Sequence, residues 1–374
     1  MMRTSKRLAS ASLLTAAALM LTACGGGVSD APSSAAAPSV TESSSAPAFT
    51  PATSGEMTLY TWSDYFPEDL AKKFTADTGI KLTVDYYDSN ETLEAKLRAS
   101  NGAGYDVVVP SDYMVQTLVA ASLLKEVDAA SLPNGKNIEE SFLNPYFDPG
   151  RKYSVPYLYG TTGYMYDTAK TSKEMTSWAD YFNAPAELGK VGTMSDQTEV
   201  VGAALRAVGG VTCSTDATQL QAAQDLLKKF KSRVSTINSD GILDRMVSGE
   251  ESIAMMWNGA AMRARAKKST LKYVYPTEGM ALWQDNFTVP VGAKNVPQAL
   301  TFLNWMMDPV NSAAAANFQR YGSGISGVND LLDADMKSAP EIVIPDGYTG
   351  AKPVEPCTNE QLTNYTQIWE SFKG

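Results

Sequence analysis

Aromatic residues and carboxylates, with one serine among them, recur just after the strands that the sequence predicts. Ligands of open α/β sheets bind beyond the carboxyl ends of the strands, so side chains in these positions can meet in one cleft. No arginine or lysine stands among them. The residues concerned are Trp62, Asp64, Tyr65, Ser111, Tyr113, Asp196, Glu199, Trp257, Trp283 and Asp285.

A cleft lined by several carboxylates is unfavourable unless a cation occupies it. Crowded, unpaired carboxylates repel one another, and their pKa values rise. Each hydrogen bond from an ammonium group to a carboxylate contributes about 1.5–3 kcal/mol, and a cation–π contact adds about 0.5–2 kcal/mol. Because aromatic faces also pack against methylene groups, the pattern predicts an elongated organic cation with an apolar stem, namely a polyamine.

Each of these residues also has a purely structural interpretation. A single tryptophan or tyrosine is more often part of a core or a rim than of a ligand cage. An aspartate after a strand is often a turn residue or a helix cap, and Asp112 has the position of such a cap. For Asp64 both interpretations stay open. The recurrence at four strand ends favours a binding site.

Strand-like and helix-like segments alternate along the chain, which is typical of an α/β fold with a mostly parallel sheet. The pattern of apolar residues predicts strands at 57–61, 80–87, 105–109, 190–194 and 252–257. It predicts helices at 67–77, 91–99, 112–124, 199–208, 217–230 and 297–307. Two extended passages, 153–167 and 271–291, interrupt the alternation. Two α/β units joined by two extended crossings predict two lobes around a cleft.

The composition argues against several classes of protein. The 374 residues include no histidine, which removes Ser-His-Asp and Cys-His catalysis and the usual zinc sites. A formal net charge of -10 disfavours binding to nucleic acid. Two Ser-x-x-Lys matches, at Ser122 and Ser269, lack a Lys-Thr-Gly partner. We therefore expect a protein that is not an enzyme and needs no cofactor or metal.

The first 24 residues have the pattern of an export signal. A basic start precedes a mostly apolar run at 8–23, which is shorter than the ~20 residues of a membrane-spanning helix. The run ends on Leu-Thr-Ala-Cys24, which resembles the bacterial lipoprotein signal and implies a lipid on Cys24; a plain signal peptide is the alternative. Residues 25–55 are rich in Ser, Ala and Pro and predict a disordered tether. We expect an extracytoplasmic or periplasmic protein anchored to a membrane by lipid.

The motifs at the strand ends resemble those of the substrate-binding proteins of bacterial spermidine/putrescine ABC transporters. The resemblance runs from about Leu59 to Tyr321 and fades at Gly322-Ser323-Gly324. It is carried by Tyr60-Thr61-Trp62-Ser63-Asp64-Tyr65, Asp77-Thr78-Gly79-Ile80, Ser89-Asn90-Glu91-Thr92, Tyr105-Asp106-Val107-Val108-Val109-Pro110-Ser111, Trp257-Asn258-Gly259 and Trp283-Gln284-Asp285.

The resemblance implies the two-lobed fold of periplasmic binding proteins, with each lobe a mostly parallel sheet flanked by helices. The first lobe would comprise residues 55–163 and 285–329, and the second 164–284 and 330–374. The ligand cleft would lie between the lobes. No contact from residues 346–360 can be placed by the resemblance.

The resemblance also implies a role for each candidate residue. The wall of the first lobe would be formed by Trp62, Tyr65, Ser111 and Tyr113. Ligand amines would be held from the second lobe by Asp196 and Glu199, and a central or terminal amine by Asp285. The stem would stack between Trp257 and Trp283, and Tyr321 would complete the cage. Asp64 matches an acidic position of the family and would contact a terminal amine.

The implied function is uptake of spermidine, putrescine or both through a membrane permease and its ATPase, with the lobes closing on the ligand. One alternative is a polyamine sensor that docks on a membrane signalling receptor. Another is the same scaffold binding ferric iron through Tyr86 and Tyr87. With Cys24 assigned to lipid, Cys213 and Cys357 remain, and we expect them to form a disulfide in an oxidising compartment.

Overall fold

A computed structural model describes residues 49–374; the predicted lipidation site Cys24 and most of the predicted tether lie outside the described residues. The described residues begin at Phe49, which precedes the tether boundary expected at residue 55. Phe49 and Ala52 pack against a hydrophobic cluster of the body. The backbone N–H of Ala52 also donates a hydrogen bond to Thr301 Oγ1 at 2.8 Å. The last residues of the predicted tether are therefore part of the fold.

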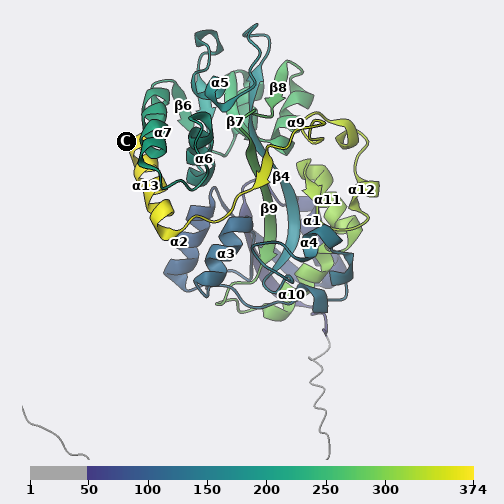
Figure 1. The fold of residues 1–374 in the computed structure, drawn as a ribbon. Helices are drawn as coiled ribbons and strands as arrows, with labels where there is room; N and C mark the ends of the chain where they lie inside the picture. Colours follow the sequence, from purple (N-terminus) through teal and green to yellow (C-terminus); the bar gives the residue numbers. More distant parts are fainter. Residues whose placement is uncertain (1–48) are drawn as a thin grey trace, which may run out of the picture. The chain divides into compact units, whose positions relative to one another are not determined.

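One 11-stranded sheet runs through the described body, in the order β2-β1-β3-β9-β4-β7-β5-β6 with β8, β10 and β11 attached to β4 or β9 (Figure 1). The strands are β1 Gly55–Trp62, β2 Ile80–Tyr87, β3 Val107–Val108, β4 Ser154–Asp167, β5 Val191–Thr193, β6 Val234–Ile237, β7 Ile253–Trp257, β8 Leu271–Val274, β9 Met280–Thr288, β10 Gly322–Ser323 and β11 Ala351–Pro353. Each predicted strand has a counterpart in this sheet.

Two parallel units and two long antiparallel strands make up the sheet. At one end β1 pairs in parallel with β2 and β3. At the other end β5 pairs in parallel with β6 and β7. Between them β4 and β9 pair with each other antiparallel, and β4 also pairs antiparallel with β7. The two extended passages of the sequence are thus the strands that join the parallel units.

Helices cover both parallel units. The helices are α1 Glu68–Thr78, α2 Asn90–Ser100, α3 Asp112–Ala120, α4 Glu140–Leu143, α5 Trp178–Phe182, α6 Gln197–Ala207, α7 Ala217–Lys231, α8 Ile242–Ser248, α9 Asn258–Lys267, α10 Val296–Met306, α11 Pro309–Gln319, α12 Val328–Leu331 and α13 Asn359–Lys373. Short 3-10 helices lie at Ala129–Ser131, Gly135–Asn137, Ala186–Leu188 and Met336–Ser338. In Figure 1, α5, α6, α7 and α13 gather around one end of β4 and β9, and α1, α10 and α11 around the other.

The predicted helix at 112–124 is too long at its C-terminal end. In the structure α3 ends at Ala120. Ser122 has a left-handed backbone with φ of 56°, and the N–H of Leu123 turns back to the carbonyl of Leu118. The apolar residues Leu123 and Leu124 are buried beyond this turn, so they extended the apolar pattern without extending the helix.

Two large hydrophobic clusters support the two ends of the sheet. One gathers around Phe74 of α1 and Phe302 of α10, whose ring centroids lie 5.2 Å apart. The other gathers around Trp178 of α5 and Phe230 of α7. Trp257 is partly buried against both clusters, which places it between the two packed regions.

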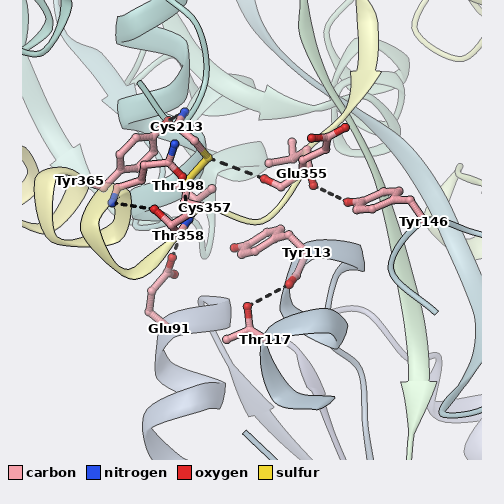
Figure 2. Close-up of a disulfide and its surroundings, with 12 residues drawn as sticks. Glu91, Tyr113, Thr117, Tyr146, Thr198, Cys213, Glu355, Cys357, Thr358 and Tyr365 are labelled. Carbon is pink, nitrogen blue, oxygen red and sulfur yellow. Dashed lines mark hydrogen bonds between the residues drawn. A yellow bond between two sulfur atoms is a disulfide. The ribbon is translucent and has the colours of Figure 1, made fainter. Parts of the chain in front are cut away.

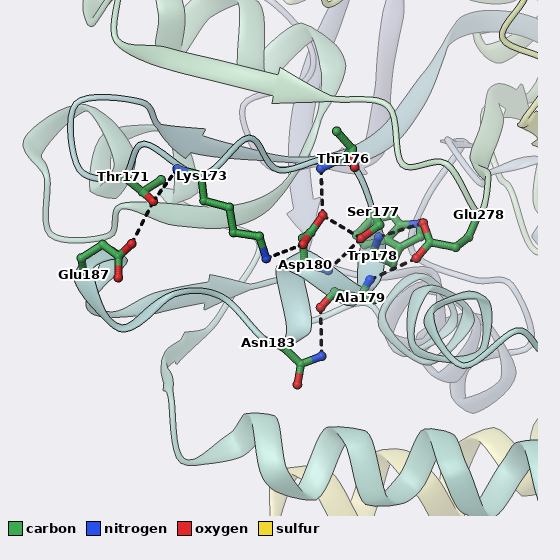
Figure 3. Close-up of polar contacts among 10 residues, drawn as sticks. All are labelled: Thr171, Lys173, Thr176, Ser177, Trp178, Ala179, Asp180, Asn183, Glu187 and Glu278. Atoms are coloured by element: carbon green, nitrogen blue, oxygen red, sulfur yellow. Dashed lines mark hydrogen bonds and ion pairs between the residues drawn. The ribbon is translucent and has the colours of Figure 1, made fainter.

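Carboxylates away from the strand ends cap helices. At the start of α5, Ser177 Oγ accepts the N–H of Asp180 at 3.0 Å, and the Asp180 carboxylate pairs with Lys173 at 2.6 Å. Glu278, from the turn between β8 and β9, accepts the N–H groups of Trp178 and Ala179 at 3.0 and 3.1 Å (Figure 3). These contacts satisfy the free donors of a helix N-terminus and bind the β8–β9 turn to α5.

Cys213 and Cys357 are joined by a disulfide, with their Cα atoms 5.3 Å apart. The bond links the loop after α6 to the segment before α13 (Figure 2). The N–H of Cys213 donates to the Tyr365 hydroxyl at 2.9 Å, which ties the same loop to α13. On the other side of the bond, the hydroxyl of Tyr146 donates to the carbonyl of Val354. The C-terminal segment is therefore fixed to the body both before and after the disulfide.

We expect reduction of this disulfide to lower the melting temperature without removing ligand binding. The bond closes a loop with a sequence separation of 144 residues, and removing such a link costs about 2–5 kcal/mol of the free energy of unfolding. Thermal melts with and without a thiol reductant measure the shift. The Cys213→Ser/Cys357→Ser variant is the control, since reductant should not shift its melt. An identical melt of the oxidised and reduced native protein would contradict the expectation.

Candidate ligand-binding site

A cavity of about 820 Å³ lies where the ends of several strands meet. A volume of this size is within the range of small-molecule sites. All of the candidate binding residues from the sequence line this one cavity: Trp62, Asp64, Tyr65, Ser111, Tyr113, Asp196, Glu199, Trp257, Trp283, Asp285 and Tyr321. The fold therefore brings together candidate residues that are up to 259 positions apart in the chain, from Trp62 to Tyr321.

Asp196 and Glu199 lie at the N-terminus of α6. Asp196 is the N-cap of this helix, and its Oδ1 accepts the backbone N–H of Glu199 at 2.9 Å. Glu199 Oε1 in turn accepts a hydrogen bond from the hydroxyl of Thr162 on β4 at 2.6 Å. The positive end of the helix dipole favours carboxylates at this position.

Burial nevertheless raises the pKa of both carboxyl groups. The pKa of Asp196 rises to about 6, because the loss of hydration outweighs its hydrogen bonds from backbone N–H groups. The pKa of Glu199 rises to about 8 through burial and, second, through the nearby charge of Asp196. Neither group forms a salt bridge within the described residues. A cation between them would remove the unfavourable charge.

Asp285 lies on β9 and is buried, with 5% of its surface exposed. The Ser111 hydroxyl donates to Asp285 Oδ1 at 2.6 Å. Asn90 fixes this arrangement, because its side-chain NH2 donates to Ser111 Oγ at 3.1 Å and to the Tyr113 hydroxyl at 2.9 Å. Burial raises the pKa of Asp285 to about 7, against the lowering effect of the Ser111 hydrogen bond.

Two further carboxyl groups lie in this region and were not predicted as site residues, the buried Asp112 and the partly buried Glu91. Asp112 lines the cavity, and burial holds its pKa well above the ordinary value. Ser111, not Asp112, occupies the N-cap position of α3, and Asp112 is its first helical residue. Glu91 of α2 accepts the Thr198 hydroxyl at 3.0 Å, and burial followed by the charge of Asp196 raises its pKa to about 8 (Figure 2). The position of Glu91 just after β2 fits the strand-end rule.

Aromatic side chains form two groups within the cavity wall. Trp62 and Trp257 lie edge to face with ring centroids 6.0 Å apart, and Trp62 Nε1–H donates to the carbonyl of Val109 at 3.0 Å. Trp283 and Tyr321 lie edge to face at 4.9 Å, and Tyr65 packs beside Tyr321 at 6.0 Å. These rings line the same cavity as the carboxylates, which is the arrangement that the predicted cage requires.

The cavity also contains cationic side chains that the survey of strand ends did not include. Arg263 and Lys267 reach it from α9, and Arg320 follows α11. Arg263 Nη1 lies 3.0 Å from Asp64 Oδ2, so the carboxylate of Asp64 already has a cationic partner. The Asp64 side chain is also 70% exposed, unlike the buried Asp196 and Asp285 and the partly buried Glu199. Asp64 therefore differs in kind from the other candidate carboxylates.

The C-terminal region contributes Val354 to the cavity wall. Sequence reasoning placed no contact from this region. β11 brings the segment to the cavity by pairing in parallel with β9, and no local motif signals such a pairing. The disulfide and Tyr146 hold the same segment in place.

The arrangement of Tyr86 and Tyr87 does not fit a shared iron site. Their side chains leave opposite faces of β2, as neighbours in a strand do. Tyr86 is 50% exposed, whereas Tyr87 is buried with its hydroxyl on the carbonyl of Val109. Among the described residues no cluster of histidine, cysteine and carboxylates could hold a metal ion. The described helices also include none long and apolar enough to cross a membrane.

The sequence signature of bacterial extracellular solute-binding proteins matches residues 69–343. The chain therefore belongs to this family of solute-binding proteins, which are not enzymes, and the prediction of a non-enzymatic protein is confirmed.

Individual relatives are named for the ligands that they bind. The spermidine/putrescine-binding periplasmic protein of Salmonella typhimurium is 34% identical over 295 residues, covering 79% of this chain and 84% of the relative. Spermidine/putrescine-binding periplasmic protein 1 of Haemophilus influenzae is 37% identical over 251 residues, covering 67% and 69%. The solved structure of a spermidine/putrescine ABC transporter substrate-binding protein from Streptococcus pneumoniae superposes with a TM-score of 0.69 at 30% identity, covering 86% of this chain and 99% of that one. These similarities confirm the two-lobed α/β fold.

Proposed function

We propose that the protein binds a polyamine, spermidine or putrescine or both, in the cavity between its lobes and delivers it to an ABC permease. The observation that carries this proposal is a set of carboxylates without a salt-bridge partner, the buried Asp196 and Asp285 and the partly buried Glu199, beside aromatic rings in one cavity. The relatives named for spermidine and putrescine binding support the same ligand class.

The electrostatics of the cavity favour an organic cation with more than one amine. The raised pKa values show that the carboxyl groups are poorly solvated, so each ammonium that enters replaces missing hydration by a charge-assisted hydrogen bond. We assign one amine to Asp196 and Glu199 and another to Asp285, which Ser111 orients. The methylene stem then packs between Trp62, Trp257 and Trp283, while Tyr65, Tyr113 and Tyr321 close the wall.

Closure of the lobes couples binding to delivery. Under the proposed boundaries, the lobes comprise 55–163 with 285–329 and 164–284 with 330–374. The hydrogen bond between Glu91 and Thr198 then joins the first lobe to the second. A bound polyamine adds contacts to both lobes and stabilises the closed form by its higher affinity for that form. The closed, loaded protein docks on the permease, whose ATPase supplies the energy, while a lipid on Cys24 keeps it at the membrane.

Isothermal calorimetry on residues 49–374 tests the ligand class. The protein is purified through unfolding and refolding to strip bound ligand, and folding is checked by circular dichroism. We expect micromolar or tighter binding of putrescine, spermidine or both. 1,4-Butanediol, which matches putrescine in length but carries no charge, is the control and should give no heat of binding. No heat with putrescine, spermidine, spermine or cadaverine from a folded protein would overturn the proposal.

A further inference from the structure

We infer that Arg263 is a specificity-determining residue that disfavours ligands with a free ammonium group at the Asp64 end of the cavity. The inference rests on the proposed function and concerns which polyamines the same cavity accepts. It predicts preference for short diamines, or for polyamines acylated at one end, over free triamines.

Arg263 and Asp64 both lie in parts of the backbone that the fold holds in place. Arg263 lies on α9, directly after the buried Met262, and its own side chain is 24% exposed. Asp64 has a left-handed backbone with φ of 53°, and the side-chain NH2 of the buried Gln319 donates to its carbonyl. The Nη1–Oδ2 distance of 3.0 Å is that of a direct ion pair. The carboxylate of Asp64 is thus paired directly with the guanidinium of Arg263.

The carboxylates of the cavity fall into two groups of different electrostatic character. Asp196, Glu199 and Asp285 form no salt bridge within the described residues. The carboxylates of the second group have cationic partners. The pairs are Asp64 with Arg263 at 3.0 Å, Asp335 with Arg320 at 3.1 Å and Asp244 with Lys267 at 3.8 Å.

An ammonium group that reached Asp64 would meet the guanidinium of Arg263 at close range. It would have to displace this intramolecular partner and remain beside a like charge, which is a repulsive element of the kind that gives specificity. A short diamine can place its amines on the unpaired carboxylates without reaching Asp64. A triamine is longer and would extend its third ammonium toward Arg263.

An acylated end avoids this repulsion. An amide at the far end of the ligand is uncharged, and its carbonyl oxygen is a hydrogen-bond acceptor. The guanidinium of Arg263 carries five N–H donors, and its contact with Asp64 is made by Nη1. A carbonyl can accept from this guanidinium, which a terminal ammonium cannot do because it has no lone pair to accept with.

Calorimetry with Arg263→Met tests the inference. The variant keeps an apolar stem and removes the charge. In the native protein we expect putrescine and at least one monoacetylspermidine to bind as tightly as spermidine or more tightly. In Arg263→Met we expect spermidine affinity to rise at least tenfold relative to that of putrescine. Lys272→Met is the matched control, because Lys272 forms an exposed ion pair with Glu174 at 3.1 Å away from the cavity; its ratio of affinities should stay within about twofold.

A double-mutant cycle separates the effect on Asp64 from a general change in charge. Asp64→Asn alone should lower spermidine affinity, because Arg263 loses its partner and its charge is no longer compensated beside the third ammonium. In the Arg263→Met background the same substitution should abolish the tenfold gain. Melting temperatures of all variants should stay within about 2 °C of the native value, because the ion pair is largely exposed.

Two outcomes distinguish this inference from the proposed function. If the amines bind but Arg263→Met leaves the ratio of spermidine to putrescine affinity unchanged, the inference is overturned and the proposed function stands. If no amine binds to the native protein or to the variants, the proposed function fails and this inference fails with it.

Discussion

Asp285→Asn is expected to weaken binding of the preferred polyamine by about hundredfold, whereas Glu126→Gln should change it less than twofold. Asp285 is 5% exposed, and its carboxylate forms a 2.6 Å hydrogen bond with Ser111. The amide has similar size but carries no charge, so an ammonium beside it loses a charge-assisted hydrogen bond while staying desolvated. A hundredfold loss corresponds to about 2.7 kcal/mol, which is typical for a buried ionic hydrogen bond.

Glu126 is a suitable control because the same change of functional group is made outside the cavity. Its carboxylate accepts the Tyr153 hydroxyl at 3.1 Å, and this contact is exposed. Calorimetry measures both affinities, and thermal melts of the ligand-free proteins establish that each variant is folded. Equal losses of affinity in the two variants would mean that the cavity has been misassigned as the binding site.

The strand-end rule grouped, from the sequence alone, residues that the structure brings to one cavity. Parallel strands bring their carboxyl ends to one edge of a sheet, so Trp62, Ser111, Asp196 and Trp257 could be grouped before their contacts were known. The alternation of strand-like and helix-like segments also allowed many of the strands and helices to be predicted. Strand β2 has the predicted bounds Ile80–Tyr87, because its flanks carry a clear helix end and loop.

Helix α9 could not be predicted from the pattern of apolar residues. Its buried residues include Gly259, Ala260, Ala261 and Ala264, so several faces of the helix are covered at once by small side chains. Such a segment has no apolar stripe with the period of a helix. As a result Arg263, one turn into α9, was not considered as part of the site.

Ion pairs between residues that are far apart in the sequence could not be predicted either. Asp64 and Arg263 are 199 residues apart, and neither lies in a motif that signals the other. Asp64 could be read from sequence as a ligand contact or as a turn residue, and the structure adds a third possibility, an ion pair at the end of the cavity. Only the fold determines which cation a given carboxylate meets.

Polyamine affinity is expected to rise about hundredfold between pH 6 and pH 8. In the ligand-free protein burial raises the pKa of Asp196 to about 6, of Asp285 to about 7 and of Glu91 and Glu199 to about 8. Several of these groups are therefore protonated near neutral pH. A bound polycation favours their charged forms, so binding releases protons. Release of one proton gives a tenfold gain in affinity per pH unit, as linkage requires.

The ligand itself does not titrate in this interval, since alkyl ammonium groups have pKa values near that of lysine, about 10.4. Calorimetry at pH 6, 7 and 8 measures the affinity. Repeating the titration at pH 7 in buffers of different ionisation enthalpy, phosphate and Tris, gives the number of protons released. An affinity that is independent of pH, with equal heats in the two buffers, would contradict the expectation.

The stability of the ligand-free protein should change with pH in the opposite direction. A carboxyl group whose pKa is higher in the folded than in the unfolded chain stabilises the fold below the unfolded pKa of about 4, and this contribution is lost as the pH rises through the folded value. For Asp196, Asp285, Glu91 and Glu199 the loss falls between about pH 4 and pH 8. The melting temperature of the ligand-free protein should therefore fall across this range. Saturating polyamine should reduce the fall, because the ligand compensates the carboxylate charges; parallel declines with and without ligand would show that these groups do not face the bound cation.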